Sequence, residues 1–412
     1  MSTTSENLVG KLRAPKLPRE RPTFTLGKKL GIAAIVVAAL AFFLTIPPFT
    51  VRSLVPSVVL VLVSLGLSIG ALREGERKLG WVGVVVAVLC LGLAYGATES
   101  GVGKLETVVS WSALTAAMLR YATPLLFAGL GGLVSERAGV VNVGLEGMML
   151  MGAFFAAWGA AESDSWLIGI LVGVLAGVAL AAVHALFSIT VRADQIVSGV
   201  ALNFVALGLT GYLYVDVFGT EGTPDDLPQV PEISLGTDSL GFIGKAISNQ
   251  NLLVWGAFIA AIAIWIFVFR TPKGLRMRSV GENPRAAETV GISVERMRYG
   301  AVLASGALAA LGGAFLSIGF VHSFTQNMTA GRGFIALAAM IFGRWHPFGL
   351  VGATLLFGLS SALAQRLPEF SPQAATLFQA LPYVLTLIAV AGLVGRSTPP
   401  AADGVPYRRE DH

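Results

Sequence analysis

The chain has 412 residues, of which 54% are hydrophobic and only 13% are charged, and its mean hydropathy is +0.73. A soluble chain would carry about twice that charged fraction, so the composition excludes an ordinary soluble domain and indicates a membrane protein. The net charge of +5 does not indicate a nucleic acid partner, because seven of the 29 basic residues crowd a polar N-terminal arm, residues 1–29.

The N-terminal arm precedes a long series of apolar runs. It is too long and too rich in proline for a simple cleaved signal peptide, so we expect a retained cytoplasmic tail. Each apolar run is long enough to cross a hydrocarbon core of roughly 30 Å as a helix, the spanning element that satisfies its own backbone groups in lipid. Twelve spans are predicted, at residues 30–46, 54–72, 80–97, 111–134, 139–161, 166–190, 196–215, 252–269, 299–320, 333–343, 348–365 and 377–394.

The first three spans contain few polar residues and form a predicted separate part, residues 30–105. The pairs Gly66/Gly70 and Gly92/Gly96 have the spacing of close helix contacts, so we expect them to pack against neighbouring helices. Cys90 is expected to be an inert packed thiol. Because it is the single cysteine of the chain, an intrachain disulfide and a cysteine-based metal site are excluded.

The remaining spans belong to a predicted main part, residues 106–395, which a tail, residues 396–412, follows. The span at 333–343 is short for a full crossing, which predicts a re-entrant or broken helix. Leu130-Gly131-Gly132 is echoed by Leu311-Gly312-Gly313 in a span predicted to run in the opposite direction, as inverted repeats of transporters do.

The distribution of charge predicts the orientation. With the N-terminus inside, the inner segments contain 23 of the lysines and arginines, the outer segments contain five, and Arg120 lies within a span. The segment 216–251, with six acidic residues and one lysine, then falls outside. Because positive residues mark cytoplasmic loops, both termini are expected in the cytoplasm.

The inner loop at residues 270–298 carries seven basic residues. Within it, Asn283 can cap a helix whose first residue is Pro284, and Gly291 is placed to end it. We therefore expect a short surface helix, which suits either docking into a groove on a partner or an ordinary positive loop. No Gly-Lys pair in the chain has the flanking residues of a P-loop, so any ATP drive must come from another polypeptide.

Four segments resemble a known family. The segment GENPRAAETVGISVERMRYGAVLASGALAALGGA, residues 281–314, resembles permeases of the ribose and branched-chain amino acid class of ABC importers. The segment TPLLFAGLGGLVSERAGVVNVGLEGMMLMGAFFA, residues 123–156, closely resembles the nucleoside-transporting branch of that class. Further similar segments are residues 191–213 and 331–358, so the resemblance covers about residues 110–395.

The resemblance implies an all-α polytopic membrane protein with about twelve transmembrane helices and a core like that of type II ABC importers. It implies a permease subunit, without its own ATPase site or a cofactor, that takes up nucleosides by alternating access in a bacterial inner membrane. The implied partners are a cytoplasmic ATPase subunit, a second permease, either a different chain or a second copy, and an extracytoplasmic substrate-binding lipoprotein. The loop at 270–298 would be the coupling loop, with the contact at Glu282, Asn283, Pro284, Arg285, Ala286, Ala287 and Gly291.

Polar residues within the spans are candidates for the substrate pathway. Asn142 and Glu146, four residues apart, share one helix face and either hydrogen-bond a nucleoside or form a buried clamp between helices. Asn203 raises the same question. Arg120 either faces a water-filled pathway or pairs with Glu146, or it has a structural role, at the outer surface or at a helix break before Pro124. The structural role is favoured because a neutral nucleoside needs no fixed cation.

Aromatic residues and histidines complete the candidates. Phe320 and Phe324 either stack on a nucleobase or belong to the interfacial aromatic belt. His184 is expected to be a packed neutral side chain, and the four scattered histidines predict no metal site. The alternatives to a nucleoside importer are a permease of this class for a sugar or a branched-chain amino acid, an ion-coupled secondary transporter, and an integral membrane enzyme, for which no catalytic constellation is present.

Overall fold

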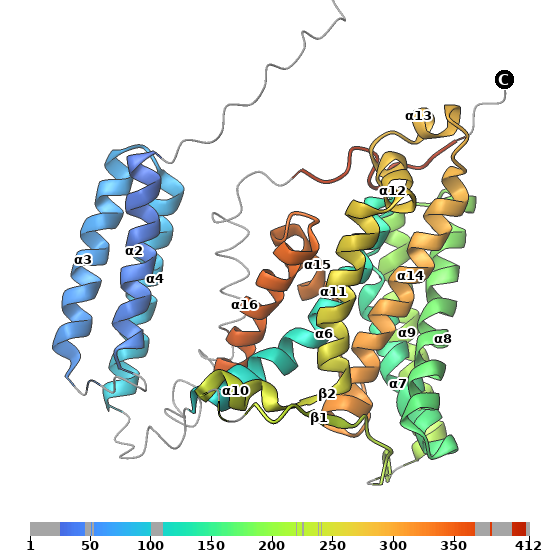
Figure 1. Cartoon of the computed structure of the whole chain (residues 1–412), viewed down its shortest axis with the longest axis horizontal. Helices are drawn as coiled ribbons and strands as arrows, with labels where there is room; N and C mark the ends of the chain where they lie inside the picture. Colours follow the sequence, from blue (N-terminus) through green and yellow to red (C-terminus); the bar gives the residue numbers. More distant parts are fainter. Residues whose placement is uncertain are drawn as a thin grey trace, which may run out of the picture. The chain divides into compact units, whose positions relative to one another are not determined.

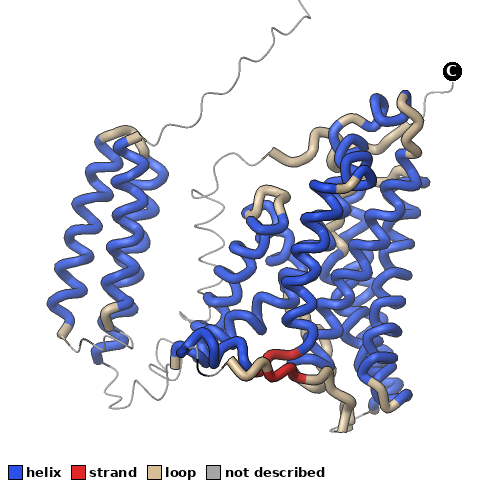
Figure 2. The backbone as a smooth tube through the Cα atoms, in the orientation of Figure 1, coloured by secondary structure: helices blue, strands red, loops and turns tan. Residues whose placement is uncertain are grey.

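A computed structural model describes residues 25–45, 51, 53–99, 110–219, 221–224, 226–237, 239, 241–366, 380 and 398–408. Nearly all of the predicted N-terminal arm and of the predicted span at 377–394 lies outside these residues. The described residues are almost entirely helical, which confirms the predicted all-α class (Figure 1). Figure 2 shows the two short strands, β1 (Glu232–Ser234) and β2 (Asn249–Asn251), which pair antiparallel.

Each of the first eleven predicted spans coincides with a helix, and nine helices of the described part are long and apolar enough to cross a membrane. The helices are α2 (Leu26–Phe43), α3 (Leu54–Arg73), α4 (Arg77–Glu99), α6 (Trp111–Arg137), α7 (Leu145–Ser163), α8 (Trp166–Ala185), α9 (Gln195–Phe218), α11 (Leu252–Arg270), α14 (Val294–Ala314), α15 (Arg332–Phe342) and α16 (Pro347–Arg366). Two short π-helices, η1 (Leu186–Val191) and η3 (Phe315–Val321), continue α8 and α14.

Helices α2–α4 and helices α6–α16 belong to two compact units, and each is described by itself. In the first unit, hydroxyl groups of α3 donate to carbonyl oxygens of α2: Ser57 to Ala41 at 2.8 Å and Ser64 to Ala34 at 2.7 Å. Of the predicted glycine contacts, the one at Gly70 is confirmed, since a Cβ atom there would lie 3.3 Å from Leu30 of α2, whereas those at Gly66 and Gly92 are wrong, because open space lies beside both residues. Other small residues, including Ala34 and Ala38, make the buried contacts instead.

The core of the second unit is built on α6, α7, α8 and α14, and α7 lies largely buried among them. Helices α6 and α14 cross closely at glycines. A Cβ atom at Gly131 would lie 2.6 Å from the Ser305 carbonyl oxygen, and one at Gly312 would lie 2.9 Å from that of Pro124. As residue numbers rise along α6, the numbers of the facing residues on α14 fall, so the two helices are antiparallel. This confirms that these two spans run in opposite directions, as predicted.

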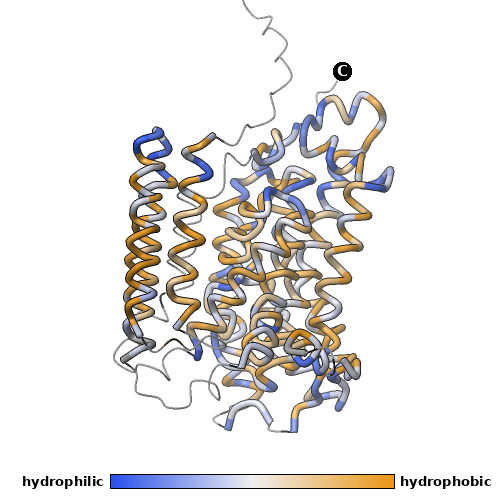
Figure 3. The backbone as a smooth tube through the Cα atoms, turned by 60° about the vertical axis from the view of Figure 1, so that its left-hand side comes forward, coloured by the Kyte–Doolittle hydropathy of each residue, from blue (hydrophilic) through white to orange (hydrophobic). Residues whose placement is uncertain are grey.

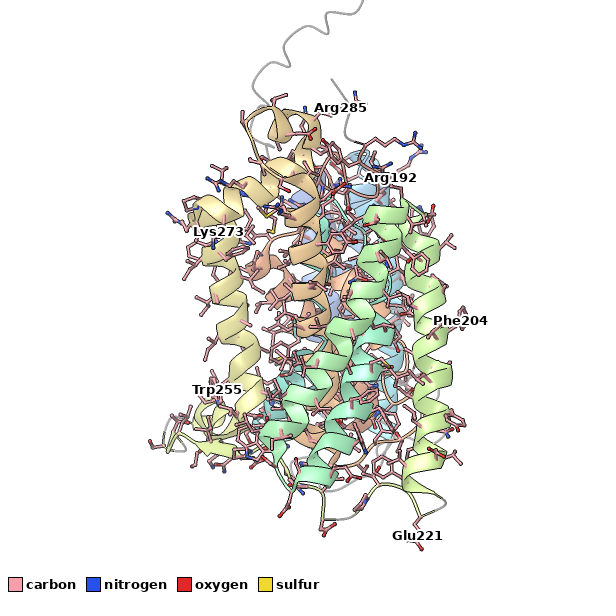
Figure 4. All side chains as sticks on the ribbon, turned by 90° about the vertical axis from the view of Figure 1, so that its right-hand side faces the viewer. Arg192, Phe204, Glu221, Trp255, Lys273 and Arg285 are labelled. Atoms are coloured by element: carbon pink, nitrogen blue, oxygen red, sulfur yellow. The ribbon has the colours of Figure 1, made fainter. Side chains whose placement is uncertain are left out.

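The two ends of the second unit differ in charge. Figure 4 places Arg192, Lys273 and Arg285 at one end, called the basic end here, and Glu221 at the opposite, acidic end. The acidic end also carries β1, β2 and the short helix α10 (Gly241–Ser248). In Figure 3 hydrophobic residues occupy the middle of the helices of each unit and hydrophilic residues gather towards their ends. This is the pattern of a polytopic membrane protein.

Two further helices, α12 (Pro272–Glu282) and α13 (Pro284–Thr289), form the basic end between α11 and α14. Helix α13 is the short helix predicted for the inner loop, whereas α12 was not predicted. Thr271 caps α12, accepting a hydrogen bond from the Gly274 amide at 3.0 Å, and Pro272 is its first residue. A polar helix of this kind carries too little apolar periodicity to be recognised from its sequence.

Candidate functional site

The basic end presents α13 on the surface. The Asn283 side chain caps it, accepting from the Ala286 amide at 3.1 Å, and Gly291 at φ +81° follows its end. These features are as predicted from the sequence. Ala287 is buried, whereas Glu282, Asn283, Arg285, Ala286 and Gly291 are exposed and Pro284 is half-buried. The helix therefore offers a partner a face of small and polar residues.

A second set of candidate residues lies inside the helix bundle. The predicted span at 139–161 begins as a helix only at Leu145, because residues 138–144 form a buried non-helical turn. Asn142 in this turn is fully buried, donates to the Ser305 hydroxyl at 2.9 Å and accepts from the Gly144 amide at 3.1 Å. Both ends of the Asn142 amide group are thus occupied within the protein.

Side chains from α8 and α9 hold the same turn from the other side. Asn203 accepts from the Gly147 amide at 2.8 Å and donates to the Val143 carbonyl oxygen at 3.0 Å. Gln195 accepts from the Val141 amide at 2.7 Å, and His184 hydrogen-bonds the Val141 carbonyl oxygen at 3.1 Å. The buried backbone groups that the missing helical turn leaves open are therefore satisfied by side chains.

Glu146, in the first turn of α7, is bonded to the N-terminus of α15, which lies far away in the chain. Its carboxylate accepts hydrogen bonds from the Gly331 amide at 2.7 Å and from the Gly333 amide at 2.6 Å, and only 8% of its surface is exposed. These two amides belong to the N-terminus of α15. A carboxylate there satisfies amides that have no partner in the helix and complements the helix dipole.

The N-terminus of α15 lies near the middle of the bundle. A Cβ atom at Gly129 of α6 would lie 3.3 Å from the Ala336 carbonyl oxygen, and one at Gly132 would lie 3.3 Å from the Met340 sulfur. The two helices thus run in the same direction. A Cβ atom at Gly333 would lie 2.5 Å from the Glu146 backbone nitrogen, so the first turn of α15 lies inside the bundle beside the first turn of α7. Helix α15 is a half-helix, as its predicted shortness indicated.

The loop that descends to this half-helix exposes polar groups. Thr325, Gln326 and Asn327 are exposed, and Gln326 donates to the carbonyl oxygen of Gly211, within α9, at 3.5 Å. Irregular backbone at membrane depth is tolerated only where protein buries it or where it lines a water-filled cavity. We call this surface, residues 325–331, the descending loop. It marks the face on which a polar pathway is expected.

The other candidate residues lie nearer the acidic end. Arg120 donates to the Gln250 side chain at 3.2 Å and to the Asn249 carbonyl oxygen at 3.3 Å, and it lies 3.7 Å from Glu232. Its partners therefore come from β1 and β2, and its carboxylate partner is Glu232 instead of Glu146. This geometry matches the structural role that the sequence favoured.

The two candidate phenylalanines lie in separate aromatic contacts. Phe320 packs edge-on against Tyr121, with ring centroids 5.5 Å apart, and stacks on Phe315. Phe324 is 1% exposed and packs against Phe154 at 5.2 Å. A side chain this buried offers no face to a ligand in this conformation. The structure therefore brings Asn142, Glu146 and Asn203 together and leaves Arg120, Phe320 and Phe324 outside that cluster.

A substitution at Arg120 should test its structural role. In Arg120→Ala the acidic-end sheet loses two hydrogen bonds and a partly exposed ion pair, and exposed ion pairs contribute little. We expect the free energy of unfolding of the purified protein to fall by about 1–2 kcal/mol, which lowers the thermal unfolding midpoint by a few degrees. Transport by the correctly folded fraction should change less than about twofold. A loss of transport without a loss of stability would contradict this role.

Several residues of this site were not recognised in the sequence. Ser305, Gly331 and Gly333 have no unusual composition around them, and each acquires its role through a partner more than 160 residues away. The motif Gly331-Arg332-Gly333 before a run of only eleven helical residues is the one local feature that points to a half-helix whose backbone amides are approached closely.

Comparison with known proteins gives matches over most of the chain. Residues 114–390 match the family described as branched-chain amino acid transport system, permease component. The chain is 41% identical to the guanosine ABC transporter permease protein NupQ of Bacillus subtilis, over 74% of this chain and 98% of the relative. It is 40% identical to the nucleoside ABC transporter permease protein NupC of Lactococcus lactis, over 74% of this chain and 99% of the relative.

Other relatives are more distant. A putative glucose ABC transporter permease protein of Haloferax volcanii, TsgC13, is 37% identical over 63% of this chain and 79% of the relative. A second guanosine permease protein of Bacillus subtilis, NupP, is 27% identical over 58% of this chain and 70% of the relative. No solved structure gives a significant match.

Proposed function

The chain belongs to the family of permease components of branched-chain amino acid transport systems, and from this premise we propose that it is the membrane-spanning subunit of an ATP-driven importer of nucleosides. The observation that carries the proposal is the meeting of two helix N-termini inside the bundle. The first turn of α7 and the N-terminus of α15 are joined through Glu146, and transporters build substrate sites where such interrupted helices meet.

Nucleosides are supported as the substrate by the relatives and by the chemistry of the descending loop. The two relatives with the highest identities reported above are named for guanosine and for nucleosides. The exposed hydroxyl and amide groups of Thr325, Gln326 and Asn327 suit the hydroxyls and base edges of a neutral nucleoside. In this proposal Asn142, Glu146 and Asn203 shape the pathway without touching the substrate, because their hydrogen bonds are made within the protein.

The basic end is proposed to face the cytoplasm, in agreement with the positive-inside rule. There α13 would seat in a separate ATPase subunit and act as the coupling helix, through the exposed face around Arg285 and Ala286. A second, different permease chain would complete the pathway, since this chain resembles two distinct guanosine permease proteins of one bacterium. An extracytoplasmic binding protein would deliver substrate to the acidic end. The predicted division into an extra part, residues 30–105, and a permease core, residues 106–395, belongs to the same proposal.

Movement of the coupling helix is proposed to switch access to the pathway. When the ATPase subunits close, α13 is displaced, and α12 and α14, which flank it, move with it. The first turn of α7, which follows residues 138–144, is joined to the N-terminus of α15 by the hydrogen bonds of Glu146 instead of by continuous helix, so the two can shift without breaking a helical core. Shifting them would open the descending loop to one side and then to the other.

Uptake by the complete transporter in proteoliposomes tests the function. Radiolabelled guanosine should accumulate only with ATP, and the rate should not change when proton and sodium gradients are collapsed. Unlabelled uridine, adenosine or guanosine in excess should compete, whereas ribose, glucose and leucine should not. Competition by glucose alone would favour a sugar permease, the reading that the similarity to TsgC13 supports. Uptake without ATP would contradict the proposal.

A further inference from the structure

The C-terminal segment Thr398–Arg408, called the strap here, lies across the basic end of the second unit. Its backbone is bonded to α12 and α14. The Ala402 amide donates to the Gly281 carbonyl oxygen at 2.9 Å, and Arg298 donates to the Val405 carbonyl oxygen at 3.0 Å. A segment without secondary structure of its own is thus held by specific bonds.

One end of the strap is fixed to the underside of α13. Tyr407 is 9% exposed, and its ring packs in a small apolar cluster with Val280, Ala287 and Val294. Its hydroxyl group hydrogen-bonds the carboxylate of Glu288 on α13. The strap therefore touches the buried side of α13 and leaves its exposed side open for a partner.

The middle of the strap is fixed to the end of α6. The Asp403 carboxyl group is hydrogen-bonded to that of Glu136, which in turn accepts from the Trp345 indole at 2.5 Å. A Cβ atom at Gly139 would lie 3.1 Å from the Ala402 carbonyl oxygen. The strap thus contacts the first residues of the turn at 138–144, and Glu146 lies in α7 two residues beyond that turn.

We propose that the strap is a positioning element that transmits movement of α13 to the turn at 138–144. This inference rests on the proposed function of α13 as the coupling helix. Helix α13 has six residues, too few to be stable without tertiary contacts. With the strap in place, displacing α13 must also displace Tyr407, Asp403 and the end of α6. Without the strap, the same displacement would be absorbed by distortion of the loop around α13.

Ionisation of Asp403 should weaken the strap. Burial raises the pKa of the Asp403 carboxyl group to about 7, against the opposing effects of the hydrogen bond to Glu136 on α6 and of the Arg298 charge on α14. The docked strap therefore binds a proton more tightly than a released strap does. The free energy that holds the strap in place is therefore most favourable below the ordinary pKa of an aspartate. It becomes less favourable as the pH rises towards 7, and above pH 7 it no longer changes with pH.

Variants at Tyr407 test transmission in the complete transporter. Tyr407→Phe removes one hydrogen bond and keeps the ring, whereas Tyr407→Ala also empties the apolar cluster. Both should bind the ATPase subunit and hydrolyse ATP within about twofold of the wild type, but substrate moved per ATP should fall about threefold in the first and about tenfold in the second. Arg408→Ala, at an exposed position of the same segment, should match the wild type. Unchanged transport per ATP in Tyr407→Ala would overturn the inference, as would loss of the ATPase subunit.

A distance measurement tests the strap without any transport. Spin labels at Arg408→Cys and Thr289→Cys, in a Cys90→Ser background, report whether the strap is docked on α13 in the purified chain. From pH 5 to pH 8 the ratio of docked to released strap should fall, and in Asp403→Asn it should fall less. A wild-type distance distribution that is the same at both pH values, or an unchanged pH dependence in Asp403→Asn, would overturn the role of Asp403. Because this readout needs no motor, it stays informative if the proposed function fails.

Discussion

Replacing Arg285 with glutamate should separate the permease from its ATPase subunit while leaving the permease folded. Arg285 is exposed on α13, so the change reverses a charge on the face offered to the partner. Charge reversal within a docking interface costs several kcal/mol, since a favourable contact becomes a repulsive one, and each 1.4 kcal/mol is about tenfold in affinity. We expect co-purification of the ATPase subunit to fall at least about tenfold and ATP-driven uptake to fall with it.

Lys273→Glu is the matched control for Arg285→Glu. Lys273 is also an exposed basic residue of the basic end, but it lies in the first turn of α12, away from α13 (Figure 4). An acidic residue there is compatible with the helix dipole, so the fold should be unaffected. If both reversals weaken ATPase binding equally, the contact is a diffuse electrostatic one and the specific role of α13 is contradicted.

Removing the carboxylate of Glu146 should have the largest effect on transport of any single change inside the bundle. Glu146 accepts from two amides at the N-terminus of α15, and leaving a buried amide without an acceptor costs about 1–3 kcal/mol. Glu146→Gln keeps one acceptor oxygen and turns an NH2 group towards the second amide. We expect uptake to fall at least about tenfold in Glu146→Gln and further in Glu146→Ala, with a lower thermal unfolding midpoint in both.

The control lies on the same helix. Glu162, near the end of α7, is exposed, and Glu162→Gln changes the formal charge by the same amount. This substitution should leave the uptake rate unchanged and the free energy of unfolding within about 0.5 kcal/mol of the wild type. Normal uptake in Glu146→Gln at normal protein levels would show that the contact between α7 and α15 is not needed for the transport cycle.

The sequence predicted the helices well because lipid imposes a simple rule on them. Each apolar run of suitable length that lies within the described residues is a helix, and the caps of α13 were recognisable because Asn283, Pro284 and Gly291 act locally. The opposed directions of α6 and α14 followed from counting spans. These features depend on residues close together in the chain, and local patterns record such dependence directly.

The arrangement of the candidate site was not predictable in the same way. The sequence could pair Asn142 with Glu146 by spacing, but it could not show that the helix begins only after Asn142. Glu146 meets Gly331, and Asp403 meets Glu136, through contacts between distant segments that leave no local pattern. Arg120 was weighed against two roles because its partners lie in a short sheet of low apolar content, which hydropathy does not reveal.

The shortness of α15 has a consequence for how the protein is made. Eleven helical residues are too few for an insertion machinery to recognise as an independent crossing. Glu146, however, is synthesised 185 residues before Gly331, so the acceptor for the half-helix is already in the bilayer when the nascent descending loop emerges. We therefore expect α15 to settle beside α6 only after α16 has been inserted. Chains lacking the Glu146 carboxylate would then be degraded during biogenesis by membrane quality control more often than chains with changes in the long helices.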